Sequence, residues 1–191
     1  MENEFDVVVV GAGISGIGAG AHFNLKCPDQ TYVILEGRES FGGTWDLFKY
    51  PGIRSDSDMH TLGYSFKPWV HKKSIANAPA IMEYLEETID EYELHPHIRY
   101  NHHVETANWS PKEGKWIVSV TDKVNNKEII FKGKLLYIVQ DIINMLMGMS
   151  QNLKARKTLK VKLSILKNGL TMLSMRIKKL WLLEAAPLLQ L

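Results

Sequence analysis

The sequence predicts an α/β fold over residues 1–137, with a parallel sheet and a small antiparallel β insert, followed by a non-native tail over residues 138–191. A β-branched run that ends in a glycine-rich turn and a second short strand that ends in an acid predict the α/β part. A change of charge separates the tail. Residues 1–137 hold 14 Lys+Arg and 19 Asp+Glu (−5), whereas residues 138–191 hold 9 and 2 (+7).

Composition limits the compartment and the class of protein. The single cysteine, Cys27, excludes an intrachain disulfide framework and favours a reducing cytoplasm. The start "MENEFDVVVV" lacks the basic and long apolar regions of a signal peptide. No apolar run has the length of a membrane span. We therefore expect a cytoplasmic location and no nucleic-acid partner.

The first element is a strand that leads into a glycine loop. Residues 7–10 are four valines, typical of a parallel strand buried on both faces. Gly11, Gly13 and Gly16 follow as G-x-G-x-x-G. In that pattern the first glycine permits the tight turn, the second lets a pyrophosphate approach the backbone, and the third lets helix pack on strand. A helix over about residues 14–26 would present its N-terminal N–H groups to phosphates.

A second strand, residues 31–36, ends at Glu36, twenty residues past Gly16. An acid at this spacing binds the ribose hydroxyls of an adenine dinucleotide. The alternative is a solvated carboxylate at a strand end. The order of strand, glycine loop, helix, strand and acid favours a Rossmann-like dinucleotide site. The histidines have no cysteine or carboxylate cluster at ligand spacing beside them, so no metal site is expected.

Residues 42–58, "GGTWDLFKYPGIRSDSD", form a second motif. Gly42 and Gly43 make a turn that lets backbone approach a ligand. Trp45, Phe48 and Tyr50 are flat apolar groups that could wall a ring system. Composition alone leaves open a long surface loop with an aromatic anchor.

This motif resembles a flavin-binding motif of class B flavoprotein monooxygenases, the flavin-containing and Baeyer–Villiger family: (A/G)-G-x-W-x(4)-(F/Y)-P-(G/M)-x(3)-D. Every fixed place of the pattern is filled, by Gly42, Gly43, Trp45, Tyr50, Pro51, Gly52 and Asp56. The resemblance extends from about residue 6 to residue 137. It implies that residues 1–137 are the N-terminal part of a Rossmann-like, FAD-binding domain.

The resemblance also implies site residues. Gly11, Gly13, Ser15 and Gly16 would line the FAD pyrophosphate, and Glu36 would bind the adenosine ribose. Further cofactor contacts would come from Gly43, Thr44, Trp45, Asp46, Leu47, Arg54, Ser55, Asp56 and, through its backbone, Val104. Asp56, near the isoalloxazine and the nicotinamide, is the catalytic candidate.

The implied activity is that of an FAD- and NADPH-dependent monooxygenase. It would insert one oxygen atom from O2 into a small-molecule ketone or onto the nitrogen or sulfur of an amine or sulfide. The NADPH domain would lie beyond this chain, so the chain itself is expected to be inactive. Two alternatives remain: a flavin-dependent NAD(P)H oxidoreductase without oxygenation, and a non-catalytic dinucleotide-binding stub.

The rest of the front half supplies one amphipathic helix and more strands. Ile81, Leu85 and Ile89 share one face of a helix in residues 78–94. Strands are expected at residues 101–110, 115–122, 127–133 and 134–138, the last as a separate return strand after a three-stranded insert.

The tail over residues 138–191 is cationic and rich in Leu and Met without a clean helical period. At face value it would be a membrane-surface or partner helix, a function that its pattern fits poorly. A frameshift at Ile138 is the favoured explanation. With free synonymous codons, the shifted frame can read F-x-G-x(3)-H-x(3)-W-P and then a second strand and G-x-G-x-x-A. The first resembles the Baeyer–Villiger fingerprint, and the second is typical of an NADPH site. The tail is therefore expected to fold poorly.

Overall fold

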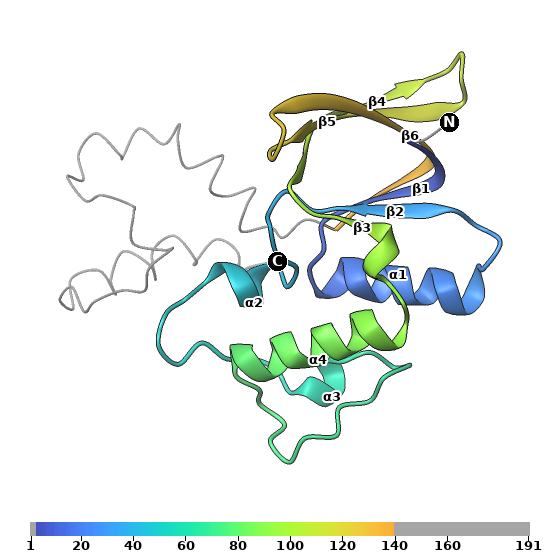
Figure 1. Ribbon diagram of the computed structural model, residues 1–191. Helices are drawn as coiled ribbons and strands as arrows, with labels where there is room; N and C mark the ends of the chain where they lie inside the picture. Colours follow the sequence, from blue (N-terminus) through green and yellow to red (C-terminus); the bar gives the residue numbers. More distant parts are fainter. Residues whose placement is uncertain (1–2, 140–191) are drawn as a thin grey trace, which may run out of the picture.

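The structure, a computed structural model, describes residues 3–139. The tail expected to be frameshifted lies outside the described residues, apart from its first two positions. One six-stranded sheet carries all the helices on one side (Figure 1). Within residues 3–139, no helix has the length and apolar character needed to cross a membrane.

The sheet is mixed, as expected for a parallel sheet with an antiparallel insert. Its spatial order is β3-β2-β1-β6-β5-β4. The first four strands in this order run parallel, and the pairs β6–β5 and β5–β4 are antiparallel. In chain order the strands are β1 (Glu4–Val10), β2 (Tyr32–Leu35), β3 (Ile98–Arg99), β4 (His102–Ser110), β5 (Lys115–Asp122) and β6 (Lys127–Ile138).

Strand β1 lies at the centre of the parallel half. Val8 pairs with Val33 of β2 on one side and with Leu136 of β6 on the other. Val8 and Val9 point to opposite faces of the sheet, and both are fully buried. The prediction from the valine run, a parallel strand buried on both faces, is confirmed.

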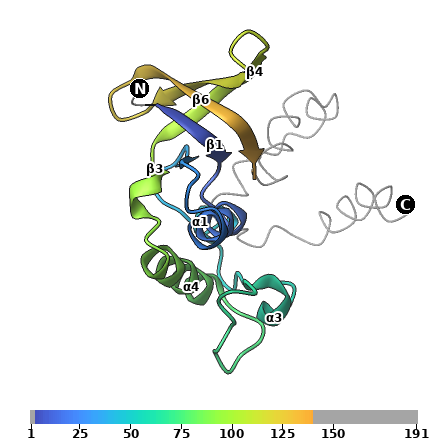
Figure 2. The same cartoon turned by 90° about the vertical axis from the view of Figure 1, so that its right-hand side faces the viewer.

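The helices form successive layers below the sheet (Figure 2). Helix α1 (Ile14–Lys26) packs on the sheet, and α4 (Ala78–Glu91) packs on α1. The one-turn helices α2 (Thr44–Leu47) and α3 (Met59–Leu62) and the 3₁₀ turn η1 (His95–His97) occupy the connections. Ile81, Leu85 and Ile89 of α4 are fully buried, as their spacing predicts.

Strand β6 differs from the expectation. The separate strands expected at residues 127–133 and 134–138 are one continuous strand of 12 residues. Its first half pairs antiparallel with β5 as far as Gly133, and its second half pairs parallel with β1 from Lys132 onward. Gly133 explains why the strand can change partners without a break. A Cβ there would lie 2.8 Å from a methyl group of Val8, so only glycine permits the close approach.

The curl of the sheet creates a second core. Val8, Val33 and Leu35 of the parallel half cluster with Val118, Val120 and Phe131 of the antiparallel half. The antiparallel strands therefore fold over the face of β1 and β2 that α1 leaves uncovered (Figure 1). The larger core lies on the other face, between the sheet, α1 and α4. Strands β1 and β2 are thus fixed from both sides.

Leu85→Ala should destabilise the protein by about 2–5 kcal/mol, because the site is fully buried and the truncation leaves a cavity. Val70→Ala is the matched control. Val70 is 88% exposed, and its truncation should change the free energy of unfolding by no more than about 0.5 kcal/mol. Urea denaturation followed by circular dichroism measures both. Equal effects of the two substitutions would contradict the placement of α4.

Candidate dinucleotide site

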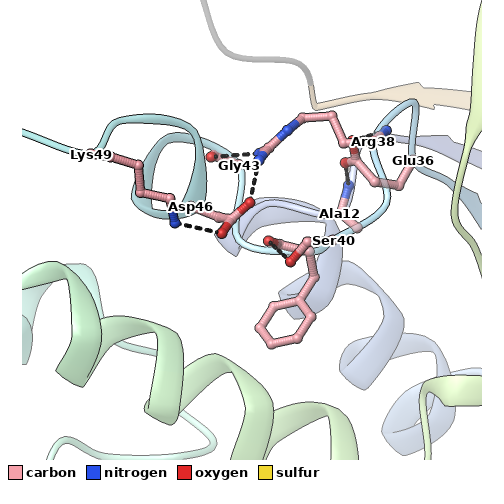
Figure 3. A network of polar contacts seen from close by, with 8 residues as sticks. Ala12, Glu36, Arg38, Ser40, Gly43, Asp46 and Lys49 are labelled. Atoms are coloured by element: carbon pink, nitrogen blue, oxygen red, sulfur yellow. Dashed lines mark hydrogen bonds and ion pairs between the residues drawn. The ribbon is translucent and has the colours of Figure 1, made fainter. Parts of the chain in front are cut away.

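Three segments meet at the carboxyl ends of β1 and β2 (Figure 3). They are the glycine loop, residues 11–16, the turn after β2, residues 36–38, and residues 42–49, which include α2. Parallel α/β sheets bind ligands at this edge. Most of the site residues expected from the sequence lie in these three segments.

The glycine loop has the geometry that its pattern predicts. Gly11 has a φ of 107°, and a Cβ on Gly16 would lie 1.9 Å from the Gly11 carbonyl oxygen. Gly13 is the N-cap of α1 and so provides no side chain to cap it. Ser15, in the first turn, is exposed. The helix therefore presents backbone N–H groups and the positive end of its dipole, an arrangement suited to an anion.

Glu36 is buried and bonded to the backbone, with 8% of its surface exposed. Its Oε2 accepts the N–H of Ala12 at 2.8 Å, and its Oε1 accepts the N–H of Arg38 at 2.9 Å. The alternative of a solvated strand-end carboxylate is therefore wrong. The carboxylate instead connects the glycine loop to the end of β2.

The glycine pair of the second motif packs against the first motif. The N–H of Gly42 donates to the carbonyl of Ala12 at 2.9 Å. Gly43 has a φ of 54°, and a Cβ there would lie 3.2 Å from the Cα of Gly13. The two loops thus approach each other through backbone alone.

Arg38 is a site residue that the sequence reading missed. Its Nη1 donates to the Gly43 carbonyl at 3.2 Å, and its Nη2 pairs with Asp46 Oδ2 (Figure 3). The Lys49 ammonium binds the other oxygen of Asp46 at 2.9 Å. Burial by itself would raise the pKa of Asp46, but the Lys49 and Arg38 cations outweigh it and hold that pKa below its usual value. The sequence offered no local signal for Arg38, because its contacts to Gly43 and Asp46 are tertiary.

The remaining residues of the second motif form a separate group. Ser55 is 2% exposed; its hydroxyl accepts the N–H of Ala76 at 3.1 Å, and its own N–H donates to the Ala76 carbonyl. Ser55 therefore holds the chain in place. Arg54 and Asp56 on either side of it are exposed. With Ser55 and Ile75 they line an open hollow of about 430 Å³.

The other expected residues divide between α2 and β4. Thr44, Trp45 and Leu47 lie in α2, where they are half-buried, and Trp45 packs against the larger core. Val104 lies in β4 beside a register shift. The start of β4 lies close to the acid, because the N–H of His102 donates to the Glu36 backbone carbonyl at 2.8 Å. The structure therefore brings this strand to the same end of the sheet.

Comparisons with known proteins agree with this geometry. Residues 9–72 match the family described as NAD(P)-binding Rossmann-like domain. The FAD-containing monooxygenase EthA of Mycolicibacterium smegmatis is 54% identical over 129 residues, which are 68% of this chain and 26% of that protein. The probable FAD-binding monooxygenase AlmA of Acinetobacter sp is 51% identical over 128 residues, 67% of this chain and 25% of that protein.

Solved structures agree as well. An oxidized steroid monooxygenase bound to NADP matches with a TM-score of 0.63 and 30% identity, over 71% of this chain and 26% of that one. Cyclohexanone monooxygenase in an open form matches with a TM-score of 0.62 and 28% identity, over the same shares. The resemblance inferred from the two motifs is confirmed: over about two thirds of its own length the chain is similar to flavin-dependent monooxygenases, and it spans about a quarter of theirs.

Proposed function

We propose that residues 3–139 form the FAD-binding part of an FAD- and NADPH-dependent monooxygenase. Such an enzyme would insert one oxygen atom from O2 into a ketone or onto a nitrogen or sulfur centre of a small molecule. The observation that carries the proposal is the buried Glu36 carboxylate, fixed beside the glycine loop. The names of the relatives support the same cofactor. A cytoplasmic location is part of the proposal.

The residues present fit the cofactor. Each carboxylate oxygen of Glu36 has accepted one backbone N–H and retains a lone pair for a ribose hydroxyl. The glycine loop and the α1 N-terminus provide close approach and a positive field for a pyrophosphate. Further contacts would come from Gly43, Thr44, Trp45, Asp46, Leu47 and the backbone of Val104.

Asp56 would act at the reacting end of the flavin. A bound FAD supplies hydride acceptance from NADPH and activation of dioxygen, chemistry that belongs to the cofactor. The protein orients it and excludes water. Asp56 is an exposed carboxylate next to Arg54 in the open hollow, where it can adjust the local charge toward a ligand. Arg54 and Ser55 would accompany it.

A dinucleotide-binding protein without catalysis is the second candidate. One observation favours it: residues 3–139 contain one G-x-G-x-x-G loop, and two dinucleotide cofactors need two such loops. The hollow at Asp56 is also open, so the described residues do not enclose a reaction. Cofactor binding and oxygenation therefore need separate experiments.

Glu36→Gln should weaken FAD binding by about 10- to 100-fold, because loss of a charge-assisted acceptor costs roughly 1.5–3 kcal/mol. Flavin fluorescence titration measures the affinity, and circular dichroism reports the folded fraction. Glu39→Gln is the matched control, since Glu39 is exposed, and its affinity should stay within about twofold of the parent. Unchanged affinity of a folded Glu36→Gln protein would remove Glu36 from the site.

Gly13→Ala and Gly16→Ala should fail in different ways. A Cβ on Gly13 meets Gly43 Cα at 3.7 Å, an ordinary contact, so this variant should fold but lose FAD because the methyl group occupies the pyrophosphate approach. A Cβ on Gly16 meets a backbone oxygen at 1.9 Å, so this variant should also lose thermal stability. Thermal melts and FAD titration separate the two. Full FAD binding by Gly13→Ala would refute the pyrophosphate assignment.

The 191-residue chain, supplied with FAD, NADPH and ¹⁸O2, should give no labelled product from a panel of ketones and sulfides. The reason is the one dinucleotide loop of the described residues. Mass spectrometry detects the label, and cyclohexanone monooxygenase serves as the positive control. Labelled product would show that the chain is a complete oxygenase and would overturn this expectation.

A further inference from the structure

We propose that Arg38 is a positioning residue of the cofactor site, which orients residues 43–47 toward FAD without binding the cofactor itself. This inference rests on the proposed function. Arg38 touches two parts of the site through different atoms. Its backbone N–H is held by Glu36, and its guanidinium holds Gly43 and Asp46.

Helix α2 needs an external support. It has four residues and no buried residue, and its N-cap, Gly43, makes no side-chain cap bond. A single helical turn is not stable alone, because nucleation fixes several backbone angles for one hydrogen bond. Tertiary contacts must therefore determine its orientation. The Arg38 guanidinium supplies two of them, one at the Gly43 carbonyl and one at the Asp46 carboxylate.

The contacts form a closed ring. Figure 3 shows the bonds of Glu36 to Ala12 and to Arg38, and of Arg38 to Gly43. The ring is closed by Gly42, the neighbour of Gly43, whose N–H donates to the Ala12 carbonyl. Through these bonds, the position of Glu36, the proposed ribose-binding acid, helps to fix the orientation of residues 42–47. A change of the Arg38 side chain would leave the Glu36–Ala12 and Gly42–Ala12 bonds in place and remove the two guanidinium contacts to Gly43 and Asp46.

Asp46 acts through this ring as well. The resemblance implies that Asp46 lies along the FAD, but its two carboxylate oxygens bind Arg38 and Lys49. Its side chain is 16% exposed, against 33% for Arg38 and 66% for Lys49. The Arg38–Asp46 pair is therefore the protected half of the network, and Lys49 is a peripheral arm exposed to solvent.

Lysine cannot replace Arg38. The guanidinium is a planar fork that addresses a carbonyl and a carboxylate at once, whereas an ammonium is a point charge on a flexible stem. Arg38→Lys keeps the charge and loses the fork. It therefore separates orientation of α2 from a general electrostatic attraction of the phosphates.

The test compares the affinities of the 191-residue chain for FAD and for ADP, the adenine half of FAD. Three single variants are compared with the parent: Arg38→Gln, Arg38→Lys and Asp46→Asn. Each should lower the affinity for FAD by about tenfold, as loss of one charge-assisted contact predicts, and the affinity for ADP by less than twofold. The double variant Arg38→Gln/Asp46→Asn should be no weaker than either single variant. Lys112→Met is the control: Lys112 is exposed in the turn between β4 and β5, outside the three segments of the site, and this variant should bind FAD like the parent.

The outcomes separate failure of the Arg38 positioning role from failure of the proposed FAD site. A parent chain that binds neither ligand refutes the proposed FAD site. A parent that binds FAD while Arg38→Gln binds it equally, with or without a lower melting temperature, refutes the positioning role alone. Equal losses of affinity for FAD and for ADP would mean that Arg38 acts at the adenosine half of the cofactor. Full FAD affinity of Arg38→Lys would mean that only the positive charge matters. Either result overturns the inference.

Discussion

The bonds from two backbone N–H groups to the Glu36 carboxylate are the constraint on which the site depends. A carboxylate with 8% of its surface exposed is costly unless its oxygens are bonded. The chain satisfies them with groups from two different segments, Ala12 and Arg38. The acid can therefore remain buried only when the glycine loop and the turn after β2 are in register. The pairing of β1 and β2 that forms the sheet therefore also places the Glu36 carboxylate beside the glycine loop.

The two motifs are assembled from this point outward. Ala12 receives Gly42 on its carbonyl while it donates to Glu36, so one residue joins both glycine turns to the acid. The curl of the sheet covers one face of β1 and β2, and α1 covers the other. The carboxyl edge of these strands is where the three loops gather. Both faces of these strands are therefore buried by packing, and the carboxyl ends of the strands are where a ligand can bind.

The sequence predicted those parts whose signal is local. The valine run, the glycine spacing and the acid after β2 each have a backbone reason, and α4 shows its period in Ile81, Leu85 and Ile89. Strand β6 was predicted as two strands. A glycine inside a strand pattern indicates either a break or a close backbone approach, and Gly133 proves to be the second, a close approach to Val8 within one continuous strand. Arg38 was missed for a related reason. Its role comes from Gly43 and Asp46, and no spacing rule connects them.

The pairing of β1 with β6 has a consequence for the order in which the molecule is made. Val8 pairs with Leu136, so the first described strand, β1, waits for one of the last described segments before its second edge is filled. Contacts so distant in sequence close slowly. Until then β1 presents an unpaired apolar edge, a template for wrong partners. Until β6 is synthesised, the described sheet therefore ends at an open edge along β1.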